Sequence, residues 1–142
     1  MFNIRNIVDT DVDDVYGFVC LLENEILEKG FFSKTFMENI RCGNNVYLMV
    51  CYHHQSVGFI ACNGQTLLHH TGMVFEIQEF YIISSFRNKG IGRLLFGKIL
   101  EFADQNKLKS IEVTTNKKRI ENIAIYENLG FGLTHNKFTI YK

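Results

Sequence analysis

The spacing of apolar residues changes several times along the chain, and this alternation is the strongest constraint on its fold. Residues 2–7, 46–52, 57–68, 74–83, 111–115 and 131–141 show the alternating or continuous apolar patterns of strands. Residues 10–28, 33–40, 91–102 and 119–129 show helical spacing instead, and the first of these helices is expected to stop at Gly30. The predicted order β-α-α-β-β-β-α-β-α-β is that of an α/β or α+β fold, in which helices flank a central mixed, mostly antiparallel sheet.

Length and composition are those of one globular domain, which we expect to span residues 1–142 without linker or repeat. Hydrophobic residues make up 46% and charged residues 21%, which excludes a disordered tail, a collagen-like fibre or a coiled coil. Fifteen basic residues balance fifteen acidic ones, so we expect no nucleic-acid partner, which would require a basic excess. No apolar run reaches the roughly 18 residues needed to cross a bilayer, so no membrane partner is expected.

The cysteines indicate a reducing compartment. Cys20, Cys42, Cys51 and Cys62 form no CxxC or CxxH pair, so the sequence argues against a structural zinc site. The first residues also lack the charged-then-apolar layout of a secretory signal. We therefore expect a cytoplasmic protein whose thiols are reduced and mostly buried.

The stretch Arg87-Asn88-Lys89-Gly90-Ile91-Gly92, between an expected strand and an expected helix, is the most informative motif. Two glycines at i and i+2 expose backbone N–H groups at a helix start, which suits a phosphate or pyrophosphate, although the same residues could form a simple turn. The motif lacks the GxxxxGK[ST] pattern of a P-loop. It also lacks the third glycine of a dinucleotide-binding fingerprint, because residue 95 is Leu.

Together, two motifs resemble the GNAT (GCN5-related) N-acetyltransferase superfamily. Arg-x-x-Gly-x-Gly at residues 87–92 follows the strand at 76–83, and Tyr126-x-x-x-Gly130-Phe131 is similar to that family's later motif. The element order is also the family's order. Short segments, among them Glu76–Glu79 and Thr115–Arg119, resemble bacterial aminoalkylphosphonate N-acetyltransferases in particular.

The resemblance implies an enzyme that transfers an acetyl group from acetyl-CoA to a primary amine by direct attack in a ternary complex. Backbone amides of residues 87–93 would hold the pyrophosphate, and the strand near residue 82 would pair with the pantetheine arm. Tyr126 would protonate the departing thiolate. The cofactor-binding residues implied in this way are Ile82, Ile83, Arg87, Asn88, Lys89, Gly90, Ile91, Gly92, Arg93 and Asn122.

Two carboxylates are candidates for the base that deprotonates the amine. Glu79 is favoured by the family pattern and Glu76 is the alternative; because they lie three residues apart on one strand, we expect them on opposite faces. Lys118, Arg119 and His135 are candidates for binding an anionic acceptor. His69 and His70 are candidate ligands for a divalent metal.

The resemblance implies a small amine as substrate, best matched by an aminoalkylphosphonate, and a possible homodimer. An arylalkylamine or polyamine, or a protein N-terminus, would be an alternative acceptor. A non-catalytic acetyl-CoA-binding module is an alternative of another class.

Overall fold

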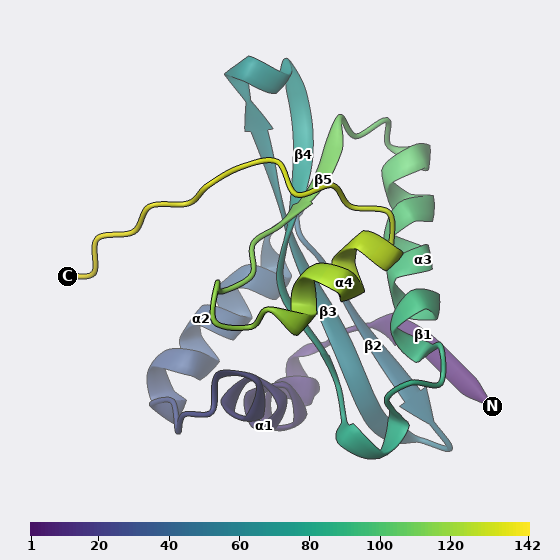
Figure 1. Cartoon of the computed structure of the whole chain (residues 1–142). Helices are drawn as coiled ribbons and strands as arrows, with labels where there is room; N and C mark the ends of the chain where they lie inside the picture. The colour runs from purple at the N-terminus through teal and green to yellow at the C-terminus, as the bar shows by residue number, and fades with distance from the viewer.

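A five-stranded sheet with the order β1-β2-β3-β4-β5 forms the centre of the computed structural model, which describes residues 1–142 (Figure 1). The strands are β1 (Phe2–Asn6), β2 (Val46–Tyr52), β3 (Gln55–Leu67), β4 (Gly72–Ile82) and β5 (Ser110–Val113). The helices are α1 (Val12–Glu23), α2 (Lys29–Arg41), α3 (Ile91–Gln105) and α4 (Glu121–Asn128). Strands β1 to β4 are antiparallel and β5 is parallel to β4, which confirms the mixed, mostly antiparallel sheet.

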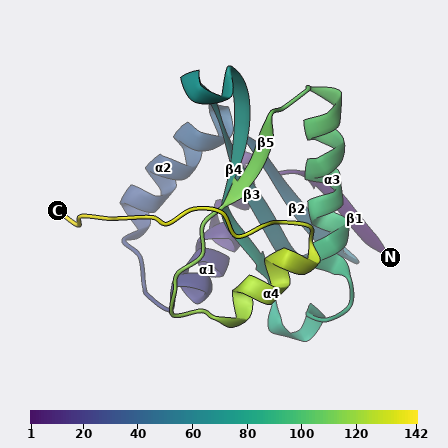
Figure 2. The ribbon, with the colours of Figure 1, turned by 45° about the horizontal axis from the view of Figure 1, so that its top comes forward.

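The central strands are buried on both faces because helices cover both sides of the sheet. Figures 1 and 2 show α1 and α2 on one side and α3 on the other. Met49 and Phe59 point into the core under α1 and α2, whereas Val50 and Ile60 point into the core under α3. None of the helices combines the length and the apolar composition that crossing a membrane requires.

The end of the first helix was predicted wrongly. Helix α1 ends at Glu23, where Asn24 adopts a left-handed conformation with φ 53°, and it does not continue to Glu28. Glu28 instead caps α2, since its carboxylate accepts hydrogen bonds from the N–H groups of Gly30 and Phe31. Gly30 therefore lies in the first turn of α2 rather than ending α1.

The predicted last strand at residues 131–141 is not formed. The N–H of Phe131 donates to Tyr126 O, and no backbone hydrogen bond involves any residue beyond it. Residues 132–142 run away from the sheet to the C-terminus (Figure 1). An alternating apolar pattern favours an extended backbone, but a strand also needs a neighbour to complete its hydrogen bonds.

Candidate active site

The start of α3 presents a row of unpaired hydrogen-bond donors. The first backbone bond of the helix runs from Leu94 N–H to Gly90 O, and the N–H groups of residues 88–93 donate to no other group of the chain. Gly90 adopts φ 79°, which glycine accepts easily, and a Cβ added there would point into open space. With the positive end of the helix dipole, these donors form a cradle suited to an anion.

Arg87 joins this cradle to the end of β4. Its Nε donates to Ile82 O at 2.8 Å, and its guanidinium lies 5.2 Å from the centre of the Tyr81 ring. The side chain of Arg87 therefore connects the loop before α3 to the end of β4. Its backbone remains available for a ligand contact.

The two last strands separate beside the cradle. Strand β5 pairs with β4 only at residues 74–77, so residues 78–82 of β4 have no strand on that side. The N–H of Ile83 donates to Val57 O on β3, and alternation along a strand therefore directs the backbone of Ile82 toward the free edge. Of the two predicted backbone contacts, Ile82 is the one available to a ligand through its N–H, because its carbonyl already accepts a hydrogen bond from Arg87 Nε.

Tyr126 lies in α4, the last helix of the chain. Its ring packs edge-on against Phe131 with centroids 5.7 Å apart, and its hydroxyl makes no hydrogen bond within the chain. Burial raises the pKa of Tyr126, and the nearby Arg119 charge opposes part of that shift. The phenol is therefore protonated at neutral pH and its proton is free to be donated.

Polar contacts hold α4 in place, since none of its residues is fully buried. Arg119, just before the helix, donates from Nη2 to Leu22 O at 2.9 Å and so reaches the last turn of α1. Arg93 of α3 donates from Nη2 to Asn128 O at 2.8 Å, at the other end of α4. Asn122 donates from Nδ2 to Thr115 Oγ1 at 2.9 Å. The position of Tyr126 therefore depends on these bonds and on the packing of Leu129 and Phe131 against the core.

The prediction that Glu76 and Glu79 occupy opposite faces is wrong. Glu79 pairs with Ala61 and Glu76 pairs with Asn63, and these two partners are two residues apart on β3. A bulge leaves Gln78 as an extra residue in β4 without a partner on β3. The bulge interrupts the alternation of side chains along β4, so both carboxylates lie on the face covered by α1 and α2. Asn63 Oδ1 on this face is buried without a hydrogen-bond partner.

Glu79 is the carboxylate with a perturbed proton affinity. Burial raises its pKa to about 7, and the charge of Glu23 at the end of α1 adds to the shift. Burial, with a contribution from Glu79, likewise raises the pKa of Tyr47 to about 12 and that of Cys62 to about 12. Glu76 accepts a hydrogen bond from Gln78 Nε2 at 2.7 Å. The sequence did not point to Glu23 or Tyr47.

The remaining predicted side chains lie apart from this site or at its border. Lys118 is exposed, and its N–H donates to Asn116 Oδ1. His135 lies in the exposed C-terminal segment, with Nδ1 2.6 Å from Thr134 Oγ1.

The structure does not support the predicted metal site. His69 and His70 lie at the tip of the β3–β4 hairpin, at the opposite end of the molecule from residues 87–92 (Figure 1). His70 Nε2 is 3.3 Å from Glu112 Oε2, but no group of three His, Cys, Asp or Glu side chains is placed to hold a metal ion.

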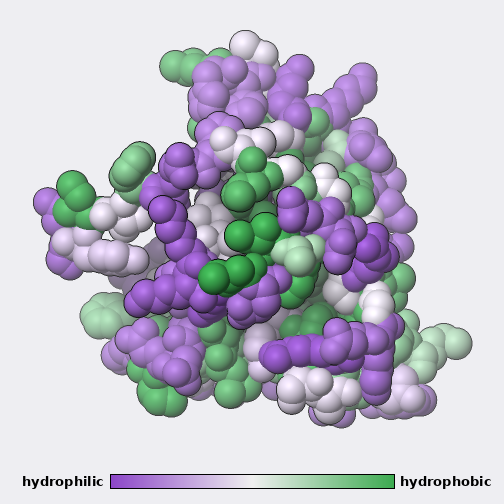
Figure 3. All heavy atoms as spheres, viewed as in Figure 1, coloured by the Kyte–Doolittle hydropathy of each residue, from purple (hydrophilic) through white to green (hydrophobic).

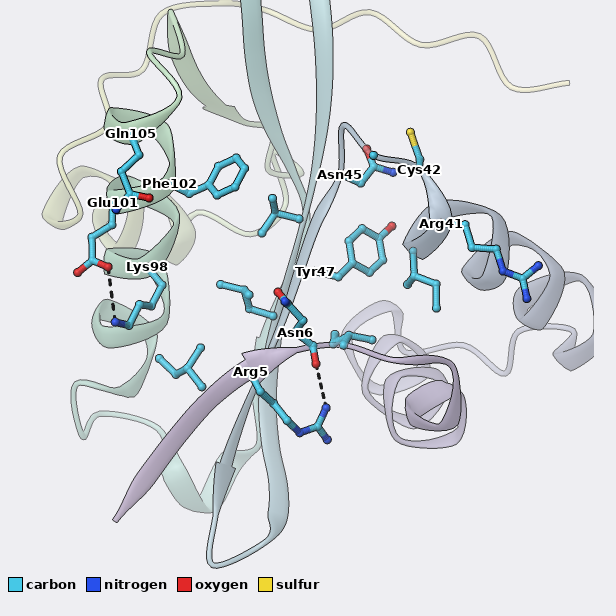
Figure 4. Close-up of a pocket in the computed structure, with 16 residues that line it drawn as sticks. Arg5, Asn6, Arg41, Cys42, Asn45, Tyr47, Lys98, Glu101, Phe102 and Gln105 are labelled. Carbon is cyan, nitrogen blue, oxygen red and sulfur yellow. Dashed lines mark hydrogen bonds and ion pairs between the residues drawn. The ribbon is translucent and has the colours of Figure 1, made fainter.

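A cavity of about 720 Å³ lies elsewhere, between β1, the end of α2 and α3 (Figure 4). Arg5, which lines it, is engaged by both carboxylate oxygens of Asp11 at 2.8 and 2.9 Å, and Lys98 lies 3.5 Å from Glu101. None of the predicted site residues lines this cavity.

Residues 13–131 match the acetyltransferase (GNAT) family, over most of the chain. The chain belongs to the GNAT family. It is therefore an acetyl-CoA-dependent N-acetyltransferase, as the two motifs suggested.

Individual relatives support the same conclusion. The aminoalkylphosphonate N-acetyltransferase of Salmonella typhimurium is 32% identical over 137 residues, which cover 96% of this chain and 88% of the relative. A Bacillus halodurans structure described as a transcriptional regulator superposes with a TM-score of 0.89 at 23% identity and 100% coverage of both chains. An aminoglycoside 6′-N-acetyltransferase of Acinetobacter baumannii has a TM-score of 0.85 at 17% identity, covering 100% of this chain and 98% of that one. The two structures establish the fold.

Acetyl transfer in a GNAT enzyme needs a site for acetyl-CoA next to groups that move protons. The donor row at residues 88–93 and the free edge at Ile82 fit a pyrophosphate followed by an amide-bearing arm. Tyr126 on α4 and Glu79 on β4 are the two predicted catalytic groups whose pKa values are raised. The thiols also agree with expectation in part: Cys20, Cys51 and Cys62 are buried, but Cys42 is exposed.

Proposed function

We propose that this GNAT enzyme transfers the acetyl group of acetyl-CoA to the primary amine of a small aminoalkylphosphonate, by direct attack in a ternary complex. The observation that carries the proposal is the 32% identity, over 96% of this chain, to the Salmonella typhimurium aminoalkylphosphonate N-acetyltransferase. The charges around the candidate site agree with such a zwitterionic acceptor, as the following steps argue.

The chain's backbone would hold acetyl-CoA. The N–H groups of residues 88–93 would donate to the pyrophosphate, and Gly90 leaves room for its close approach. The free edge of β4 at Ile82 would pair with the amides of the pantetheine arm as a further strand does. Asn122, held near the edge by Thr115, is a side-chain contact for the same arm.

Two side chains would move the protons. The raised pKa of Glu79, about 7, means that about half of these carboxyls are ionised at neutral pH and able to accept the amine proton. Tyr126 would donate its proton to the thiolate of CoA as the thioester bond breaks. Its phenol is the weaker acid, so this transfer requires that Tyr126 lie next to the sulfur and that the proton move together with bond cleavage. The free hydroxyl of Tyr126 suits that role.

The acceptor would be held by groups of opposite charge at its two ends. The ammonium end would lie toward Glu79 and Glu23 before it loses a proton, and the unpaired Asn63 Oδ1 would accept a hydrogen bond from it. The phosphonate would lie toward Arg119, which spends one donor on Leu22 O and retains others. Lys118 and His135 are exposed and would add charge at the border of the site.

The test is thiol release from acetyl-CoA with a panel of amines, with and without divalent metal. Aminomethyl- and aminoethylphosphonate should be turned over in preference to neutral alkylamines of the same length, arylalkylamines, polyamines and peptide N-termini. Arg119→Gln should raise KM for a phosphonate amine much more than for the matched neutral amine. Arg41→Gln, an exposed arginine at the end of α2, serves as the control.

Each other outcome contradicts part of the proposal. An equal rise in KM for both amines in Arg119→Gln would indicate that Arg119 binds acetyl-CoA and not the phosphonate. Turnover of arylalkylamines or polyamines, but of no phosphonate amine, would identify that class of amine as the acceptor in place of the aminoalkylphosphonate. Acetyl-CoA binding without thiol release for any amine would identify a binding module.

A further inference from the structure

Tyr47, on β2, lies in the same cross-strand row of the sheet as Glu79. Tyr47 pairs with Ala61 of β3, and Ala61 pairs with Glu79 of β4. Paired residues of neighbouring strands point to the same face, so all three side chains lie on the face covered by α1 and α2. The bulge that leaves Gln78 without a partner brings Glu79 into this row.

Only the methyl group of Ala61 separates the two polar side chains of the row. Neighbouring strands lie about 4.8 Å apart, so the backbones of Tyr47 and Glu79 are about 9.6 Å apart, a gap that a phenol and a carboxyl side chain together can span. The two groups influence each other. After burial, the charge of Glu79 is the largest cause that raises the pKa of Tyr47 to about 12.

The hydroxyl of Tyr47 has a neighbour that donates to it but no acceptor for its own proton. Asn39, in the last turn of α2, lowers the pKa of Tyr47, as a donor to the phenolic oxygen does. Tyr16 is the tyrosine whose hydroxyl donates within the chain, to Leu27 O, and the hydroxyl of Tyr47 does not. Figure 4 shows the Tyr47 ring on the side of the sheet toward α2.

Two further hydrogen bonds hold Asn39 in place. Asn45 Nδ2 donates to Asn39 O at 3.0 Å, and Asn45 Oδ1 accepts from the N–H of Gly64 at 3.3 Å. The turn before β2 approaches Gly64 so closely that a Cβ there would overlap Asn44 O. The end of α2 is therefore tied to β3, the strand that pairs with β4 at Glu79.

We propose that Tyr47 is a positioning residue for acetyl transfer: its hydroxyl donates, through one bridging water, to the carboxylate of Glu79 and stabilises the ionised form that accepts the amine proton. The inference rests on the proposed role of Glu79 as the base. A phenol suits this task because it stays protonated at neutral pH. A water bridges the pair because no direct hydrogen bond joins them.

The other titratable groups that face Glu79 do not stabilise its ionised form. Glu23, at the end of α1, repels the charge of Glu79, and burial acts in the same direction. Cys62 of β3 has its pKa raised to about 12 and is neutral at pH 7. Hydrophilic residues cover much of the surface (Figure 3), yet no lysine or arginine lowers the pKa of Glu79. A neutral donor in the same row is therefore the chain's means of favouring the carboxylate.

The test replaces Tyr47 with Phe, which keeps the ring in the core and removes only the hydroxyl. The pKa of Glu79 is measured by ¹³C NMR of carboxyl-labelled glutamate without substrate, with Glu79→Gln identifying the signal, and the pH profile of kcat/KM is measured by thiol release. Tyr47→Phe should raise the pKa of Glu79 by about 1 and move the acid limb by the same amount. At pH 7, kcat/KM should fall about fivefold, because the ionised fraction falls from about one half to about one eleventh.

Two other variants make the result specific to the hydroxyl of Tyr47. Tyr52→Phe is the matched control, because Tyr52 lies on the same strand but packs against the core under α3; it should leave the pKa of Glu79 and the acid limb unchanged. Asn39→Ala leaves the Tyr47 ring intact and removes the donor behind its hydroxyl. This variant should raise the pKa of Glu79 in the same direction by a smaller amount, because a hydroxyl that loses its donor is a weaker donor itself.

An unchanged pKa of Glu79 in Tyr47→Phe would overturn the inference, and so would an equal rise in Tyr52→Phe. If Tyr47→Phe did not fold, an unchanged pKa of Glu79 in Asn39→Ala would decide against it in the same way. Failure of the proposed base is distinguishable from these results. In that case Glu79→Gln would keep the acid limb, while the NMR signal of Glu79 would still respond to the loss of the Tyr47 hydroxyl.

Discussion

Replacing Glu79 with Gln tests the central electrostatic feature of the site. Burial, with help from Glu23, raises the pKa of Glu79 from 4.5 to about 7, so the folded protein holds this proton more tightly than the unfolded chain does. The stability from the raised pKa is present below about pH 4.5 and is lost as pH rises through about 7. At about 1.4 kcal/mol per pH unit, the loss is at most about 3.5 kcal/mol.

The neutral amide of Glu79→Gln removes this pH dependence. The variant should therefore gain stability relative to the parent between about pH 5 and about pH 8.5, by up to the same amount, in urea or thermal unfolding followed at each pH. Activity should change in the opposite sense. The value of kcat/KM, measured by thiol release, should fall by about 10²–10⁴ and lose the acid limb near pH 7 that we expect for the parent.

Glu76→Gln is the matched control, because Glu76 lies on the same strand and the same face of the sheet. This control should keep the acid limb. The reasoning fails if Glu76→Gln loses the limb and Glu79→Gln keeps it. It also fails if the stability difference between the parent and Glu79→Gln does not change with pH.

Three further changes probe the cofactor side of the site. Tyr126→Phe should lower kcat by about 10²–10⁴ and leave the calorimetric affinity for acetyl-CoA nearly unchanged, because only the hydroxyl is removed; a kcat within about twofold of the parent would make Tyr126 a packing residue. Gly90→Val should weaken acetyl-CoA binding sharply, and Gly130→Val, at φ 103° and also facing open space, controls for backbone strain; equal affinities of the two variants would argue against the cradle. Arg93→Met should lower kcat without changing acetyl-CoA affinity, since the bond to the end of α4 is lost but the backbone N–H stays, and Arg93→Lys should restore part of the activity; a loss confined to affinity would contradict this positioning role.

Local sequence determined much of the fold. The period of the apolar residues predicted every strand of the sheet and the positions of all four helices, because burial of one face is encoded in the spacing along each element. His53 and His54 form the tight bend that connects β2 to β3, with φ 48° and 67°. The glycine at residue 90 indicated the donor row at the start of α3, since its φ of 79° lies in the left-handed region that favours glycine. The sequence-based boundary between the first two helices was wrong, because the caps at Asn24 and Glu28 determine where α1 ends and α2 begins.

The arrangement of the candidate site was decided by tertiary structure. Which face Glu76 and Glu79 share depends on a bulge in the pairing of β4 with β3, and a strand's own sequence does not state its register. The raised pKa of Glu79 requires α1 to pack over it and to bring Glu23 near, although the two residues are far apart in the chain. Arg119 reaches Leu22 across 97 residues in the same way. The alternating pattern at 131–141 suited a strand, but pairing needs a second edge within reach, and the path of the chain after Phe131 does not provide one.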